Sequence, residues 1–85
     1  MSMVHELSLT KRRVAGIKQV LRFARAGLLE KVYIAKDADE QVIKKALDVC
    51  IEYAIPFDTA YTMHQIGSAC GLDVGSACAG VLKTS

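Results

Sequence analysis

The chain has 85 residues, of which 52% are hydrophobic and 24% are charged, and its formal net charge at pH 7 is +2. This balance excludes an intrinsically disordered chain, and the apolar stretches are all shorter than the roughly 20 residues that a membrane-spanning helix needs. We expect a single domain over residues 1–85, with a core that needs neither a metal nor a disulfide.

The cysteines are odd in number, widely spaced and set among apolar residues. Cys50, Cys70 and Cys78 are therefore predicted to be small core hydrophobes rather than a disulfide or a redox centre. The N-terminus lacks the basic and apolar regions of a secretory signal peptide, so the expected location is the cytoplasm.

In chain order, the first expected element is a short helix over residues 3–11. A brief strand at residues 14–15 leads into an amphipathic helix over residues 17–26, which Gly27 ends as a left-handed C-cap residue. The candidates for the core on the first helix are Val4, Leu7 and Leu9.

The second part of the chain begins with a β-rich, apolar stretch at residues 31–35, which predicts a buried strand. Residues 37–40 then indicate a helix start, with Asp37 as an acidic cap and Glu40 three residues on, and the helix is expected over residues 39–53. Its inward-facing residues are predicted to be Val42, Ile43, Ala46, Leu47, Cys50 and Ile51.

A further strand is expected at residues 55–60, where Pro56 suits a strand start or a sheet edge. Residues 62–65 have the form of a capping box and predict a short helix that Gly71 closes, and a last strand follows at residues 77–82. Because strands and helices alternate with short connections, the predicted fold is a three-layer α/β/α sandwich around a four-stranded mixed sheet.

The basic residues are concentrated near the N-terminus: six of the eleven lie within residues 11–25, a stretch without an acidic residue. At about 100° per residue, Lys18, Arg22 and Arg25 share one face of the expected helix. A localised basic patch is typical of a phosphate or nucleic-acid site. A merely solvated helix face is the alternative that charge alone leaves open.

Catalytic and metal-binding signatures are absent from the sequence, which has no G-x-x-x-x-G-K-[ST], G-x-S-x-G, H-E-x-x-H or C-x-x-C motif. His5 and His64 lie far apart without flanking ligands, so neither is expected to bind a metal. The glycines at 67, 71 and 75 do not form a dinucleotide fingerprint and are expected to serve close packing and a turn. The sequence is therefore not expected to encode an enzyme.

The start of the amphipathic helix has a chemistry of its own. Gly16 stands at the N-cap position without a side chain to satisfy the first N–H groups, which leaves them and the positive end of the helix dipole available to an anion. Lys18 and Gln19 follow in the first turn. Because glutamine carries both a donor and an acceptor, Gln19 can read a base edge where Lys18 only meets a phosphate.

Several motifs occur in a fixed order along the chain: Val14–Gln19 followed by Arg22, Ala35–Asp39, Ile55–Phe57 and Ile66–Gly71. Together they resemble the ribosomal protein L7Ae family of kink-turn RNA binders, and its small bacterial branch in particular. The resemblance extends over about residues 4–83. It implies the same α/β/α sandwich and an RNA site made of two parts.

The first part implied by the resemblance is a Gly-x-Asn-Glu segment with a lysine one turn on, which enters the widened major groove at tandem sheared G·A pairs. Matched residue by residue, Gly16 takes the place of the glycine, Lys18 that of the Asn, Gln19 that of the Glu and Arg22 that of the lysine, with Ile17 as the variable residue. The pair Lys18–Gln19 thus departs from the Asn-Glu of archaeal members.

The second part implied by the resemblance is the loop after the last helix, which packs apolar atoms under a flipped-out nucleotide and supplies backbone contacts. In this chain the loop lacks the basic residue and the proline of archaeal members and carries an acid instead. Its residues are Leu72, Asp73, Val74, Gly75 and Ser76.

The residue pattern and the resemblance together predict a non-catalytic protein that stabilises kink-turns with tandem sheared G·A pairs in ribosomal or other structured RNA. We expect a monomer that binds RNA, without a cofactor, a metal, a membrane or a small-molecule substrate. Two alternatives stay open. One is a protein-interaction or ribosome-associated factor of the same fold with little RNA affinity, and the other is a substrate-recognition domain like those fused to RNA methyltransferases.

Overall fold

The computed structural model describes residues 10–83. The expected helix over residues 3–11 lies almost entirely outside the described residues, and residues 10 and 11 are not helical. The described elements are β1 (Arg13–Ala15), α2 (Ile17–Arg25), β2 (Leu29–Ile34), α3 (Glu40–Glu52), β3 (Phe57–Asp58), α4 (Met63–Ala69) and β4 (Cys78–Leu82).

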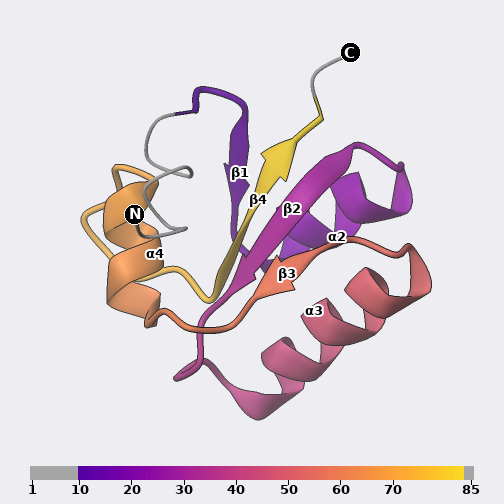
Figure 1. The fold of residues 1–85 in the computed structure, drawn as a ribbon. Coiled ribbons are helices and arrows are strands. Elements are labelled where there is room, and N and C mark those ends of the chain that lie inside the picture. The colour runs from indigo at the N-terminus through magenta and orange to yellow at the C-terminus, as the bar shows by residue number, and fades with distance from the viewer. Residues whose placement is uncertain (1–9, 84–85) are drawn as a thin grey trace.

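The four strands form one mixed sheet in the order β1-β4-β2-β3. Strand β4 runs antiparallel to both β1 and β2, whereas β3 runs parallel to β2. Helices α2 and α3 lie on one side of the sheet and α4 on the other (Figure 1). The predicted three-layer sandwich around a four-stranded mixed sheet is confirmed.

The two faces of the sheet carry two separate apolar cores, because successive side chains of a strand point to opposite faces. Val32 and Ile34 of β2 belong to the larger core with residues of α2 and α3, while Tyr33 and Ala35 belong to the smaller core with Ile66 of α4. All five are completely buried. The central strand β2 therefore joins both layers of helices to one sheet.

The helix termini follow the local signals in the sequence. Gly27 has a φ of 72°, and its N–H and that of Leu28 donate to carbonyls of the last turn of α2 in a Schellman motif. The N-cap of α3 is Asp39 and not Asp37, whose carboxylate accepts the Met63 N–H of α4 instead. Thr62 and Gln65 form the predicted capping box at the start of α4. The helices expected at residues 17–26 and 39–53 are confirmed within one residue at each end.

The inward face of α3 differs from the prediction at its C-terminal end. Ala46 and Cys50 are buried as expected, but the Ile51 side chain is 69% exposed, and Val49, which was not assigned to the core, is only 4% exposed. Because α3 packs against α2 as well as the sheet, its buried face is centred on residues 46, 49 and 50. Ile51 is rotated by 100° from Cys50 around the helix axis, in the direction away from Val49, so its side chain points to solvent.

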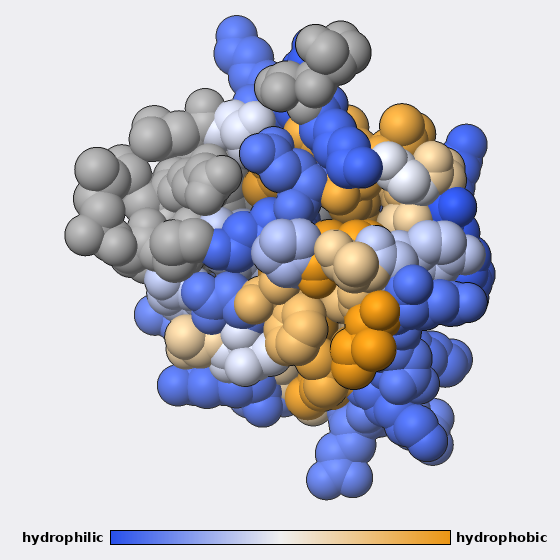
Figure 2. All heavy atoms as spheres, turned by 45° about the vertical axis from the view of Figure 1, so that its right-hand side comes forward, coloured by the Kyte–Doolittle hydropathy of each residue, from blue (hydrophilic) through white to orange (hydrophobic). Residues whose placement is uncertain are grey.

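Strand β3 is shorter than expected, since only residues 57 and 58 of the predicted strand at 55–60 pair with β2. The Asp58 carboxylate accepts a hydrogen bond from the Ala60 N–H at 2.8 Å, and this local turn ends the pairing. Phe57 lies on the edge strand and is 43% exposed. Figure 2, which brings this side of the molecule forward, shows apolar surface in the middle of the face between hydrophilic regions.

All three cysteines are free thiols. Burial raises the pKa of the Cys50 thiol to about 11 and that of the Cys78 thiol to about 12. Cys70 is partly buried against the smaller core, and burial raises its pKa while the nearby Arg13 guanidinium opposes the shift. The predicted role as core hydrophobes is confirmed for Cys50 and Cys78, and Cys70 lies at the margin of a core.

None of the helices within residues 10–83 has both the length and the apolar character that crossing a membrane requires.

Candidate nucleic-acid interface

The two parts of the site expected from the sequence meet at one end of the sheet. Strands β1 and β2 both end where β4 begins, so the start of α2 and the loop over residues 72–76 (the 72–76 loop) reach the same place (Figure 1). The Cys78 carbonyl oxygen joins them directly. It accepts a hydrogen bond from the Gly16 N–H at 2.9 Å and another from the Ser76 hydroxyl at 2.7 Å.

The start of α2 presents free N–H groups. Gly16 has φ 91° and ψ 152°, and within the described residues no side chain caps this helix. The first intrahelical bond runs from the Val20 N–H to the Gly16 carbonyl at 3.0 Å, so the three N–H groups before Val20 precede the helical hydrogen bonds. Lys18 and Gln19 are exposed beside them, while Ile17 is half-buried against the larger core and anchors the turn.

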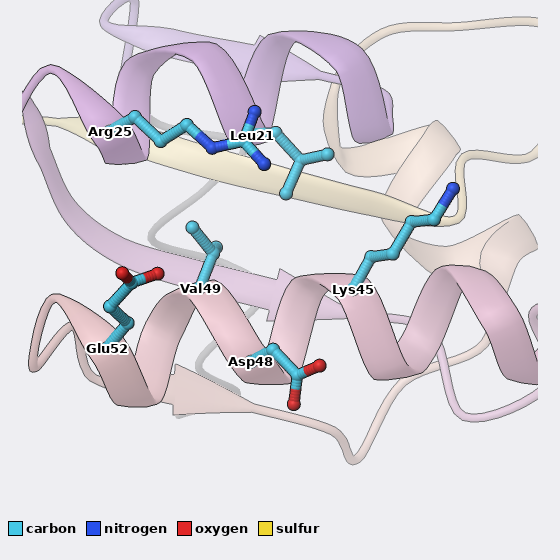
Figure 3. Close-up of a pocket in the computed structure, with 6 residues that line it drawn as sticks. All are labelled: Leu21, Arg25, Lys45, Asp48, Val49 and Glu52. Atoms are coloured by element: carbon cyan, nitrogen blue, oxygen red, sulfur yellow. The ribbon is translucent and has the colours of Figure 1, made fainter.

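Arg22 and Arg25 have different surroundings on α2. The guanidinium carbon of Arg22 lies 5.6 Å from the centroid of the neighbouring Phe23 ring, and the Arg22 side chain is exposed. Arg25 lines a groove of about 290 Å³ between α2 and α3, and its side chain runs back along α2 toward Leu21 (Figure 3). Lys45, Asp48 and Glu52 of α3 line the same groove, so charges of both signs surround it.

The basic residues at the start of β1 bond to other parts of the chain. Arg12 donates to the Lys83 carbonyl at 3.2 Å, and Arg13 donates to the Thr10 carbonyl at 2.7 Å and the Cys70 carbonyl at 3.2 Å. These residues lie at the amino end of β1, whereas α2 starts at its carboxyl end. The basic residues of the stretch 11–25 are therefore divided between the two ends of β1, and Lys18 is the one in the first turn of α2.

The 72–76 loop is presented by the backbone of α4. The Leu72 N–H donates to the Gly67 carbonyl at 2.9 Å, and the Ser76 N–H donates to the Met63 carbonyl at 3.0 Å. A Cβ atom on Gly67 would collide with the Val74 carbonyl oxygen, so only glycine lets the loop lie this close to the helix. The predicted role of Gly67 in close packing is confirmed.

The side chains of the 72–76 loop divide into exposed and buried groups. Leu72 is 42% exposed and Val74 is 71% exposed, which confirms the prediction that these apolar side chains lie at the surface. Asp73 and Gly75 are exposed as well. Ser76 is only 6% exposed and its hydroxyl is committed to Cys78, so this side chain holds the loop in place and does not face a ligand.

Comparisons with known proteins agree with this architecture. The profile of the ribosomal protein L7Ae/L30e/S12e/Gadd45 family matches residues 2–85. The chain belongs to this family. A relative named as an RNA-binding protein from Caldanaerobacter subterraneus is 44% identical over 68 residues, covering 80% of this chain and 83% of the relative. Another RNA-binding protein, from Halalkalibacterium halodurans, is 36% identical over 70 residues, covering 82% and 85% of the two chains.

Two solved structures share the L7Ae fold with this chain. A protein of unknown function from Bacillus halodurans superposes with a TM-score of 0.82 at 25% identity, covering 95% of this chain and 81% of that protein. The 15.5kD RNA binding protein of Giardia lamblia superposes with a TM-score of 0.78 at 24% identity, covering 96% and 69% of the two chains. The resemblance to the L7Ae family stated from the sequence motifs is confirmed.

One exposed cation of this L7Ae family member was missed by the sequence prediction. Lys36 follows β2 and is exposed, and its N–H donates to the Tyr61 carbonyl at 2.9 Å. On one side, Cys78 of β4 pairs with Ile34, the last residue of β2, and on the other side its carbonyl accepts the Gly16 N–H. The end of β2 and the start of α2 are therefore two strand spacings apart, or about 10 Å. The sequence signal for Lys36 is its place between a buried strand and Asp39, the residue that caps α3.

Residues 10–83 contain no group of three or more His, Cys, Asp or Glu side chains that could hold a metal ion. His64 is exposed on α4, and His5 lies outside the described residues.

Proposed function

We propose that this L7Ae family member is a non-catalytic, single-domain RNA-binding protein that recognises kink-turns with tandem sheared G·A pairs, acting as a monomer in the cytoplasm. One observation carries the proposal: the Cys78 carbonyl accepts hydrogen bonds both from Gly16, at the uncapped start of α2, and from Ser76, at the end of the exposed 72–76 loop. Relatives of 44% and 36% identity are named RNA-binding proteins, which supports RNA as the ligand.

The start of α2 suits the groove of an RNA helix. Free N–H groups and the positive end of the helix dipole attract a phosphate, and the exposed Lys18 adds a full charge. Nothing lies within 4 Å of where a Gly16 side chain would begin, so an RNA backbone can approach closely. Gln19 supplies one donor and one acceptor for a base edge.

The 72–76 loop supplies the preference for a kinked RNA over a straight duplex. Leu72 and Val74 offer exposed apolar atoms on the loop whose last residue, Ser76, shares the Cys78 carbonyl with Gly16 at the start of α2. A nucleotide extruded from the stack can pack its base on such atoms, whereas a continuous duplex keeps its bases stacked inside. Asp73 places a negative charge next to this surface and weakens the attraction to phosphate.

The electrostatic contribution should be modest. Lys18 and Arg22 are exposed cations on α2, and Lys36 is an exposed cation that follows the end of β2 at this end of the sheet. Three phosphate contacts give a slope of about −2 to −3 for the logarithm of the binding constant against the logarithm of salt concentration. The change Lys18→Ala should reduce the slope by about 1. The matched control is Lys44→Ala, which removes an exposed lysine in the second turn of α3.

The proposal is tested by titrating the protein into a kink-turn RNA and into a straight duplex of equal length. We expect tight binding to the kink-turn and weak, salt-sensitive binding to the duplex. The change Gln19→Ala should cost about 1–3 kcal/mol on the kink-turn and leave duplex binding unchanged. Equal affinity of the wild-type protein for both RNAs would overturn kink-turn recognition, and equal losses for Gln19→Ala would assign Gln19 to general electrostatics.

A protein-interaction role of the same fold is the second candidate. The observation that favours it is exposed apolar surface where α3 leads into β3, with Ile51 69% exposed and Phe57 43% exposed. Weak binding to both RNAs that does not respond to Lys18→Ala would favour this role over RNA recognition.

A further inference from the structure

The turn between β2 and α3 is bonded to the helix that carries the 72–76 loop. The Asp37 carboxylate oxygen Oδ1 accepts a hydrogen bond from the Met63 N–H at 2.7 Å, across 26 residues of sequence. Met63 is the first residue of α4, and its N–H belongs to the group that no intrahelical carbonyl can satisfy. Thr62 caps a different N–H, that of Gln65, so the two caps are complementary.

Met63 passes this constraint to the loop. Its carbonyl accepts a hydrogen bond from the Ser76 N–H at 3.0 Å. Gly75 packs directly against it, since a Cβ atom on Gly75 would lie 3.1 Å from the Met63 Cβ. Asp37, Met63 and the last two residues of the 72–76 loop therefore form one connected chain of contacts.

We propose that Asp37 is a positioning residue that fixes the 72–76 loop in its RNA-binding conformation through Met63, without contacting RNA itself. This inference rests on the proposed function, because the loop must be part of the RNA surface for its position to affect affinity. Asp37 is not the cap of the helix that follows it, since Asp39 fills that place. Its side-chain hydrogen bond runs to α4.

The sign of the effect separates positioning from simple charge. A carboxylate close to an RNA surface repels phosphate, so removing it should strengthen binding when charge is its only influence. A loop that is held in place for only a fraction of the time binds more weakly by that fraction. Loss of the Asp37 bond should therefore weaken kink-turn binding even though a negative charge is removed.

The test compares Asp37→Ala with Asp39→Ala as a matched control. Asp39 also carries an exposed carboxylate, and it accepts one backbone bond, from the Gln41 N–H at 2.8 Å, at the start of α3. If the loop is held for a tenth to a third of the time without Asp37, kink-turn affinity falls about 3- to 10-fold. Duplex affinity should not fall, and Asp39→Ala should not weaken kink-turn binding.

Amide hydrogen exchange without RNA provides a readout that is independent of the proposed function. The Ser76 amide should exchange faster in Asp37→Ala than in the wild type or in Asp39→Ala. If the wild-type protein shows no preference for the kink-turn, the proposed function is overturned. Ser76 exchange in Asp37→Ala would still show whether Asp37 positions the 72–76 loop. Unchanged Ser76 exchange, or kink-turn affinity that is equal or higher in Asp37→Ala, would overturn the role of Asp37.

A second substitution covers the case in which Asp37→Ala does not fold. Asparagine keeps an oxygen acceptor at the same position but removes the charge. We expect wild-type Ser76 exchange and at least wild-type kink-turn affinity for Asp37→Asn. Faster Ser76 exchange in Asp37→Asn would overturn positioning through the hydrogen bond.

Discussion

The Val74 side chain is expected to matter for RNA binding and hardly at all for stability. It is 71% exposed, so truncation to alanine removes little buried area. Exposed substitutions usually change the free energy of unfolding by no more than about 0.5 kcal/mol, which corresponds to a melting temperature shift of about 2–4 °C in a domain of this size. If an extruded base packs on both methyl groups, their loss costs about 0.8–1.6 kcal/mol of binding free energy, or about 4- to 15-fold in Kd.

The matched control is Val81→Ala, which makes the same chemical change at a position that is only 5% exposed in the smaller core. This change should cost about 2–3 kcal/mol in stability and lower the melting temperature by at least about 8 °C. Thermal melts and kink-turn titrations on both variants separate the two roles. A stability loss for Val74→Ala as large as that for Val81→Ala, with unchanged RNA affinity per folded molecule, would refute the surface role of the loop.

Three further changes probe the loop and the core. Asp73→Lys should strengthen kink-turn binding at low salt and much less at high salt, because exposed charges are screened; a salt-independent gain would contradict this. Gly67→Ala should displace the 72–76 loop and weaken kink-turn binding, since its Cβ would lie 2.9 Å from the Gly75 Cα and closer still to the Val74 carbonyl; unchanged affinity would show that the loop is not positioned by this contact. The Cys50 and Cys78 thiols have raised pKa values of about 11 and 12, so the folded state holds its protons more tightly. Urea denaturation should show stability that is complete below pH 9 and falls above it by up to about 1.4 kcal/mol per pH unit for each thiol, a fall that Cys50→Ala should make less steep.

The parts of the fold that could be predicted are those with a local physical cause. The C-terminal end of α2 at Gly27 and the Thr62–Gln65 capping box each depend on a few neighbouring residues, and the structure has both. The exposure of the Ile51 side chain could not be predicted from its neighbours in the sequence. Which face of α3 is buried depends on its contact with α2, and this contact is a property of the tertiary arrangement.

The candidate site shows the same division. The free N–H groups at the start of α2 follow from Gly16 alone, and the structure has no side-chain cap there within the described residues. The grouping of the cations depends instead on strand order. Arg12 and Lys18 are only six positions apart in the sequence but flank opposite ends of β1. Lys36 is distant in sequence and follows β2, which ends on the same side of the sheet as β1 because β4 lies antiparallel between them.

The most direct measurement of the central claim is the shape of the RNA on binding. A kink-turn duplex is labelled with a fluorescent donor and acceptor at its two ends, because a protein that selects the kinked state shifts the population of the RNA toward it. We predict that adding the protein brings the two ends together, with a titration midpoint that Gln19→Ala moves to higher protein concentration. Binding that leaves the distance between the two ends unchanged would contradict kink-turn recognition.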